Sequence, residues 1–261
     1  MFGEKVEILD KTMGNHALHD QLWEQSQTNY ILESLKDGEK LQDILERTPG
    51  FKEAFLTELD TLDCADGRVC SGHKMGLAGS GILLSPEEKE ILKAEAKKRG
   101  LKITGHDNCG AAALAYPGSD SDKFGYENAR TLASETGLEY GEVHAQDFQV
   151  SVHNERMLVI EETGRFDCAN WAEFPGQFIS SAPALGLPDA YLQKEIVALT
   201  NIALGNHSFG SRFTSEDPFY VVISASSAEK LAHLEEVATE AVQVFKDRVR
   251  VSGFIAPEKK E

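Results

Sequence analysis

Residues 101–110 read Leu-Lys-Ile-Thr-Gly-His-Asp-Asn-Cys-Gly, and an earlier apolar segment runs into Cys-Ala-Asp-Gly-Arg at residues 64–68. Between the two, Ser85-Pro86-Glu87-Glu88 has the features of a helix start, and Lys97-Lys-Arg-Gly100 has those of a helix end. The pattern predicts a strand, a loop, a helix over 86–99 and a second strand. A right-handed crossover would bring both strand ends to one edge of a parallel sheet, where open α/β folds place their sites.

That edge would gather metal-binding side chains. Cys64 converges with His106 and Cys109, which together supply two thiolates and one imidazole. Such a set leaves the fourth tetrahedral position of a zinc ion for water, aspartate or substrate. Cys109 also precedes Gly110-Ala-Ala-Ala, the expected first turn of a helix, whose positive end favours a thiolate. We therefore expect Zn²⁺ to be bound by Cys64, His106 and Cys109.

The two motifs resemble those of the β-class carbonic anhydrases. That family pairs Cys-x-Asp-x-Arg at the end of one core strand with Gly-His-x-x-Cys-Gly at the end of another, and residues 64–68 and 105–110 match both patterns. The resemblance covers about residues 55–116. It implies a zinc lyase of the carbonate dehydratase type, in which zinc-bound hydroxide hydrates carbon dioxide to bicarbonate.

The resemblance also implies roles for individual residues. Asp66 would accept a hydrogen bond from the zinc-bound water, and Arg68 would keep Asp66 ionised through a bidentate pair. The backbone amide of Gly110 would bind the product oxyanion. In some members of the family the aspartate closes the fourth zinc position. Homodimers or higher even oligomers are usual.

The sequence departs from the family pattern in three places. The interval from Cys64 to His106 is short, residues 75–81 read Met-Gly-Leu-Ala-Gly-Ser-Gly, and the chain after residue 166 exceeds a compact member. These differences leave the substrate open, because relatives of this architecture act on carbonyl sulfide or carbon disulfide. A non-catalytic zinc-binding protein is another alternative. So is a closed structural zinc site, with Cys70 or Asp66 as its fourth ligand.

The remaining candidate residues receive structural interpretations. Glycines at 76–81 match neither the dinucleotide fingerprint nor a P-loop, so we expect a loop that runs close to the metal edge. His144 and His153 are interpreted as surface or strand-edge residues. Cys168 is interpreted as a partly buried thiol, and His207 as part of a glycine-flanked turn.

Composition limits the partners and the compartment. The chain has 26 basic and 43 acidic residues among 261, and its net charge of −17 disfavours nucleic acid and anionic membranes. A chain of this length buries roughly three-quarters of its unfolded surface, so it needs no disulfides, and its four cysteines favour a reducing compartment. The sequence shows neither a signal peptide nor a membrane-spanning stretch. We expect a cytoplasmic protein that binds a small molecule.

The sequence predicts an α/β protein with a central, mainly parallel sheet flanked by helices. Residues 1–50 would form an N-terminal helical arm, residues 51–165 the zinc-binding core, and residues 166–261 a C-terminal extension of the same domain. Within the last segment, a strand, a helix and a strand at 219–255 would extend the central sheet or, alternatively, form a small lobe of their own. A strand at 156–160 would also belong to that sheet.

The N-terminal arm is predicted to contain helices at 16–35 and 40–47. Its apolar residues exceed what a free arm tolerates, which favours burial against a neighbouring subunit in a two-fold dimer. No internal repeat is visible in the sequence.

Overall fold

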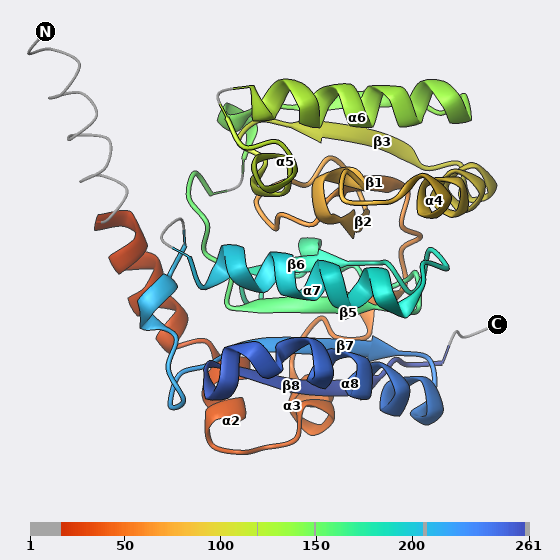
Figure 1. Ribbon diagram of the computed structural model, residues 1–261. Coiled ribbons are helices and arrows are strands. Elements are labelled where there is room, and N and C mark those ends of the chain that lie inside the picture. Colours follow the sequence, from red (N-terminus) through yellow and green to blue (C-terminus); the bar gives the residue numbers. More distant parts are fainter. Residues whose placement is uncertain (1–16, 119, 149, 206–207, 259–261) are drawn as a thin grey trace, which may run out of the picture.

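The computed structural model describes residues 17–118, 120–148, 150–205 and 208–258, so that His16 and His207 lie outside the described residues. Two four-stranded sheets, both fully parallel, form the centre of the molecule, and helices pack around them (Figure 1). The α/β class predicted from the sequence is confirmed. Within the described residues, no helix combines the length and the apolar character needed to cross a membrane.

The first sheet has the order β2-β1-β3-β4 and the second has the order β6-β5-β7-β8. The first contains β1 (Thr61–Cys64), β2 (Lys74–Leu77), β3 (Lys102–His106) and β4 (Tyr140–Val143), connected by α4 (Pro86–Arg99), α5 (Gly110–Ala115) and α6 (Ser121–Thr136). The second contains β5 (Met157–Glu161), β6 (Gln177–Ser180), β7 (Phe219–Ala225) and β8 (Val249–Ile255), connected by α7 (Asp189–Ala203) and α8 (Ala228–Val242). A helix over residues 17–27, α2 (Tyr30–Lys36) and α3 (Leu41–Arg47) precede both sheets.

Helix α4 begins and ends where its sequence signals indicate. The Ser85 hydroxyl accepts a hydrogen bond from the Glu88 amide, and the Glu88 side chain accepts one from the Ser85 amide, which makes a complete capping box. Gly100 ends the helix in the left-handed region at φ 67°. These local signals explain why the predicted helix over 86–99 agrees with the structure at both ends.

The second sheet is covered by helices on both faces. Leu158 and Ile160 of β5 point to the side of α7 and α8, in a core that continues into the first sheet. Met157 and Val159 point to the opposite side, where they join the apolar residues of α2 and α3. The alternation along β5 therefore places one apolar face against each helical layer.

The two sheets meet along the edges of β2 and β6. The Ser181 amide donates to the Gly76 carbonyl at 2.7 Å, and the Ile179 amide donates to the Ala65 carbonyl at 2.8 Å. Gly76 pairs with Asp63 in the first sheet, so it lies two residues before Ala65 along the direction of β1. Their partners in the second sheet run the other way, because Gly76 bonds to Ser181 and Ala65 bonds to the earlier residue Ile179. The two edges therefore run antiparallel, and the labelled strands follow one another across the whole molecule in Figure 1.

The two halves repeat one topology. In each half the second strand lies outside the first, and the third and fourth strands follow on the other side. A Gly-Arg pair also follows the first strand of each half, as Gly67-Arg68 after β1 and as Gly164-Arg165 after β5. The structure thus contains an internal repeat that the sequence does not reveal.

The second sheet corrects two predictions. The strand predicted at 156–160 exists as β5, but it pairs with β6 and β7 and not with the first sheet. The closing unit β7-α8-β8 completes that second sheet and does not extend the first. Strands β2, β4 and β6 were not predicted, because each has four residues and two of them lack a continuous apolar run.

The N-terminal helices pack on their own chain. The predicted helix over 16–35 divides at Asn29, which caps α2 by accepting from the amides of Ile31 and Leu32. Ile31 and Leu32 are buried within the second core, and Trp23 packs edge-on against Phe209. These apolar faces are covered within one chain, so their hydrophobic surface gives no argument for a dimer.

The contact between the two sheets can be tested at Gly76. A Cβ atom there would lie 2.3 Å from the Ile179 carbonyl oxygen, so Gly76→Ala should lower the free energy of unfolding by about 1–3 kcal/mol. In the control Gly125→Ala, within α6, the added Cβ would lie 3.4 Å from the Ala112 Cβ and 3.8 Å from the Cys109 Cβ, which are ordinary contacts, and the loss of a helical glycine should raise stability by up to about 1 kcal/mol. Urea unfolding of both variants measures the difference. A Gly76→Ala variant as stable as the parent would contradict the edge contact.

Candidate metal centre

The ends of two neighbouring strands carry the predicted metal-binding residues. Cys64 is the last residue of β1 and His106 is the last residue of β3, and the two strands pair directly in the first sheet. Cys109 follows three residues later as the N-cap of α5. The structure therefore brings the three side chains together, as the sequence predicts, at the carboxyl edge of the sheet.

The three ligating atoms are close enough to share one ion. They lie within 4.8 Å of one another, and the three side chains are buried. The sulfur atoms of Cys64 and Cys109 are 3.8 Å apart. A disulfide requires about 2.05 Å, whereas two thiolates at about 2.3 Å from one tetrahedral zinc would be separated by about 3.8 Å. The spacing fits a shared metal ion and does not fit a disulfide.

His106 is oriented as a metal ligand. Its Nδ1 lies 2.7 Å from the carbonyl oxygen of Asp107, which makes Nδ1 the protonated nitrogen and leaves the Nε2 lone pair free. That Nε2 is buried and has no hydrogen-bond partner within the part of the chain that the structure describes. A buried nitrogen lone pair without a hydrogen bond destabilises the fold. A cation bound by this lone pair and the two sulfur atoms would remove that cost, so the cluster is suited to a cation.

Backbone amides support both sulfur atoms. The Gly79 amide donates to Cys64 Sγ at 3.2 Å, and the Ala112 amide donates to Cys109 Sγ at 3.4 Å. The hydrogen bond with the Cys109 thiol lowers the pKa of Cys64 well below its ordinary value, against the effect of burial. The same contact with Cys64, together with burial, raises the pKa of Cys109 well above its ordinary value. Without a cation, the pair therefore shares one proton.

The turn between His106 and Cys109 is fixed by its own side chains. Asn108 adopts the left-handed region at φ 55°, which asparagine tolerates better than most residues. The Asp107 carboxylate accepts from the Tyr126 hydroxyl at 2.7 Å and from the Ala145 amide at 2.9 Å. The turn is thus tied to α6 and to the segment that follows β4.

Asp66 and Arg68 form the predicted buried pair beside the cluster. The guanidinium donates from Nε to Oδ1 at 3.0 Å and from Nη2 to Oδ2 at 2.6 Å, and the Arg68 amide also donates to Oδ1. Burial would raise the pKa of Asp66, but the charges of His153 and Arg68 outweigh it and lower the pKa far below the usual range. Asp66 is therefore ionised at every physiological pH.

Two further residues hold this pair in place. Lys74 is fully buried, and its Nζ donates to the carbonyl oxygens of Asp66 and Val69, which fixes the loop that carries the pair. Phe148 lies against the Arg68 guanidinium, 5.1 Å from ring centroid to Cζ, and against the His106 ring. Phe148 thereby covers the dyad and the cluster together.

His153 is the residue that the sequence interpretation placed wrongly. It is 8% exposed rather than on the surface, and its Nε2 lies 4.0 Å from Oδ2 of Asp66. Its Nδ1 lies 3.0 Å from the fully buried Glu155 carboxylate. The His-x-Glu spacing at 153–155 was the available signal. In a short segment before β5, however, nothing in the sequence indicated that it folds back onto Asp66.

Asp66, His153 and Glu155 are themselves close enough to hold an ion, but their charges are already balanced. Arg68 occupies both oxygens of Asp66, and His153 bridges the two carboxylates. With His153 protonated, two negative and two positive charges cancel. We therefore interpret this group as an ion-pair network that supports Asp66, and not as a second metal site.

The other candidate residues lie apart from the cluster. Cys70 donates to the Gly72 carbonyl, and burial raises its pKa, so it is not placed as a fourth ligand. Cys168 is fully buried, which corrects the expectation of a partly buried thiol, and burial raises its pKa well above the ordinary value. His144 is exposed, as predicted. Gly110 opens α5 beside Cys109 and packs closely on Ile202 of α7.

A cavity of 170 Å³ opens beside the dyad. Gly67 and Arg68 line it from the first half, and the second half lines it with the loop before β6, which includes Cys168, Trp171 and Phe174, and with Gln177 at the start of β6. Both halves of the chain therefore shape the approach to Arg68.

Comparisons of the chain with protein-family models, with curated proteins and with solved structures found no match. The interpretation of the centre consequently depends on its own residues and geometry.

The ligand assignment predicts which cysteines retain a metal. Cys64→Ser and Cys109→Ser should lose nearly all bound zinc at neutral pH, because an alcohol is a far weaker ligand than a thiolate. Cys70→Ser and Cys168→Ser are matched controls outside the cluster and should bind about one zinc per chain, like the parent. Metal analysis after gel filtration measures the content. Full occupancy in both of the first two variants would refute the assignment.

The ion-pair network predicts a pH dependence of stability. Burial alone would lower the pKa of His153, but Glu155 and Asp66 raise it above its ordinary value. Because the pKa of His153 is higher in the folded than in the unfolded chain, its protonation stabilises the fold. This stabilisation is complete below pH about 6.5 and is lost as the pH rises through the pKa of the folded state. In metal-free protein, His153→Gln should therefore flatten the decline in unfolding free energy above pH 6.5. Urea unfolding from pH 6 to 9 measures the slope, and an equal slope in the parent and in His153→Gln would contradict the network.

Proposed function

We propose that the protein is a zinc enzyme that hydrates carbon dioxide to bicarbonate, a lyase of the β-carbonic-anhydrase type. The observation that carries the proposal is the buried Asp66–Arg68 pair beside a Cys-His-Cys set whose imidazole Nε2 has no hydrogen-bond partner among the described residues. A purely structural zinc site needs four protein ligands, and within the described residues only three lie in the cluster. Three ligands and an adjacent ionised carboxylate are the arrangement of a catalytic site.

The donor set suits zinc. Thiolates and imidazole favour zinc among the common divalent ions, whereas calcium and magnesium prefer oxygen ligands. Cys64, His106 and Cys109 would hold the ion. Zinc in such a site would supply a nucleophile at neutral pH, because it lowers the pKa of water to about 7.

The residues of the chain would orient the reaction. The Asp66 carboxylate accepts a hydrogen bond from the attacking water and so directs the water's lone pair at the carbon of carbon dioxide. Arg68 fixes both oxygens of that carboxylate and keeps it ionised. His153 adds positive charge on the other side of Asp66. Phe148, packed on His106 and Arg68, limits the access of bulk water.

The same residues suit other linear molecules with an electrophilic central carbon. Carbonyl sulfide and carbon disulfide are therefore the alternative substrates, and a protein that binds zinc without turnover is the alternative from a different class. Rates with the three substrates, measured on one zinc-loaded preparation, distinguish these possibilities. Turnover of a sulfur compound with no hydration of carbon dioxide would replace the proposed substrate. Zinc content without any turnover would remove the enzymatic proposal.

The dyad separates catalysis from metal binding. Asp66→Asn and Arg68→Ala should retain zinc but lose about a hundred- to a thousand-fold in hydration rate, since orienting and electrostatic interactions of this kind contribute roughly 2.7–4 kcal/mol. The double variant should lose little more than either single one, because both changes break one pair. Stopped-flow measurement of proton release, together with zinc analysis, gives both quantities. A parental rate in Asp66→Asn would refute the mechanism, even in an active zinc enzyme.

A further inference from the structure

A turn from the first half of the chain contacts the metal centre directly. Residues Ala78–Ser80 follow β2, and the Gly79 amide is the donor to Cys64 Sγ at 3.2 Å. Gly79, Ser80 and Gly81 have φ angles of 56°, 50° and 88°. Three successive residues in the left-handed region, one of them with a side chain, persist only where surrounding groups hold them. The position of this sulfur donor therefore depends on what anchors the turn.

One anchor of the turn comes from the other half of the chain. Glu195 of α7 is fully buried, and its Oε1 accepts a hydrogen bond from the Ala78 amide at 2.6 Å. The same oxygen accepts from the Tyr191 hydroxyl at 3.0 Å, and Oε2 accepts from the Ser180 hydroxyl at the end of β6. Burial raises the pKa of Glu195 to about 7. Burying a carboxyl group costs free energy of folding, and here the three hydrogen bonds that it accepts offset that cost.

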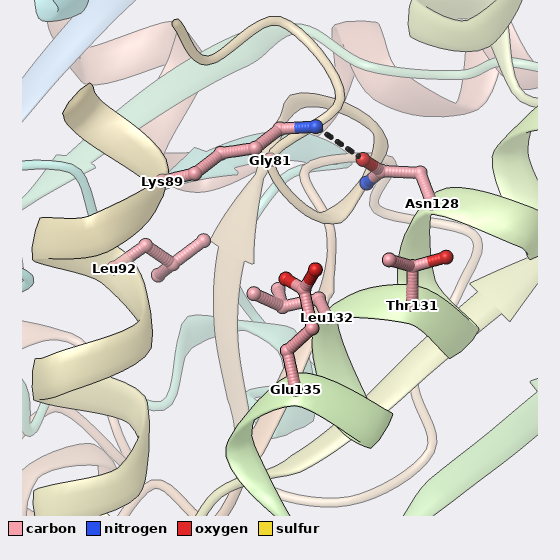
Figure 2. Close-up of a pocket in the computed structure, with 7 residues that line it drawn as sticks. All are labelled: Gly81, Lys89, Leu92, Asn128, Thr131, Leu132 and Glu135. Carbon is pink, nitrogen blue, oxygen red and sulfur yellow. Dashed lines mark hydrogen bonds between the residues drawn. The ribbon is translucent and has the colours of Figure 1, made fainter. Parts of the chain in front are cut away.

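The opposite side of the turn is held by the first half of the chain, where the Ser80 hydroxyl donates to the Thr104 carbonyl oxygen of β3 at 2.6 Å. Asn128 of α6 donates from Nδ2 to the carbonyl oxygens of Gly79 and Ser80, both at 3.4 Å, and Lys89 donates to its Oδ1 (Figure 2). The cavity in Figure 2 has a volume of about 20 Å³, room for a single water and not for a substrate. Ser80 and Asn128 therefore hold the turn from the first half of the chain, and the bond from Ala78 to Glu195 holds it from the second.

We propose that Glu195 is a positioning residue of the metal centre, which acts through the Ala78 amide to hold the Gly79 amide against the Cys64 thiolate. The inference rests on the metal centre of the proposed function. It assigns the C-terminal half a role in that centre. Glu195 of α7 and Ser180 of β6, in the second half, fix the position of the Gly79 amide, which donates to the Cys64 sulfur in the first half. Outer groups that orient ligands of this kind usually contribute ten- to a hundred-fold in metal affinity.

The chain offers a matched control for this proposal. Glu161 is also a fully buried glutamate of the second half, but its carboxylate bonds locally, to the amides of Thr163 and Gly164 and to the Thr163 hydroxyl. A substitution there removes a buried carboxylate of the same kind without touching the turn at 78–80. Glu161 therefore separates an effect on folding from an effect on the metal centre.

The test measures zinc affinity by competition with a chelator of known affinity in the full-length protein. Glu195→Met keeps the volume but removes the acceptor, and it should weaken zinc binding by about ten- to a hundred-fold. Glu195→Gln keeps a carbonyl oxygen for the Ala78 amide and should remain within about three-fold of the parent. Glu161→Met should bind zinc like the parent, whatever it costs in stability. Ser180→Ala, a milder change, should weaken binding in the same direction and serves if Glu195→Met fails to fold.

A second readout is specific to the sulfur. In cobalt-substituted protein the thiolate-to-cobalt charge-transfer band reports on hydrogen bonds to the ligand sulfurs, so it should shift in Glu195→Met and stay in place in Glu195→Gln and Glu161→Met. Parental affinity and an unshifted band in Glu195→Met would overturn the inference and leave the proposed function intact. If Glu195→Met binds zinc more weakly but the parent protein does not hydrate carbon dioxide, the inference is supported and the proposed activity is removed. A parent that binds no zinc would overturn both.

Discussion

Two buried sulfur atoms held 3.8 Å apart set the central constraint on this molecule. Two buried thiols this close cannot both ionise without a cation. The Nε2 lone pair of His106 is also buried and accepts no hydrogen bond within the described part of the chain, which is costly unless a cation is bound there. The surrounding backbone is arranged around this cluster. β1 and β3 end at two of the ligands, α5 begins at the third, and amides from two separate turns donate to the sulfurs.

The centre could be predicted because its residues lie next to strong local signals. Cys64 and His106 end strands that flank one well-capped helix, and chain direction in a parallel sheet then forces their convergence. The support from more distant residues could not be predicted in this way. His153 reaches Asp66 from a segment without periodicity, and Glu195 reaches Ala78 across 117 positions of the sequence. Such contacts depend on how one sheet is placed against the other.

The internal repeat illustrates the same limit. The stretch Cys-Ala-Asp-Gly-Arg after β1 corresponds in position to Glu-Glu-Thr-Gly-Arg after β5, and only the Gly-Arg pair is shared. Almost all side chains can be replaced without changing the topology as long as the apolar alternation persists. The repeat is therefore not visible in the sequence beyond this Gly-Arg pair. Chemistry is less tolerant. The half that keeps Cys64, His106 and Cys109 holds the cluster, and Glu161 stands where Cys64 would be in the other half.

The edge-to-edge contact of β2 and β6 also affects how the protein behaves at high concentration. An exposed sheet edge is a template for pairing with another chain, and two separate sheets would present four such edges. Here two of the four cover one another, which leaves β4 and β8 outermost. β4 is short and carries the exposed Glu142, while the Gln42 side chain accepts from the Ile255 amide of β8, whose Arg250 is exposed. The edge contact that places the second half against the Cys-His-Cys cluster therefore also reduces the number of strand edges open to pairing with another chain.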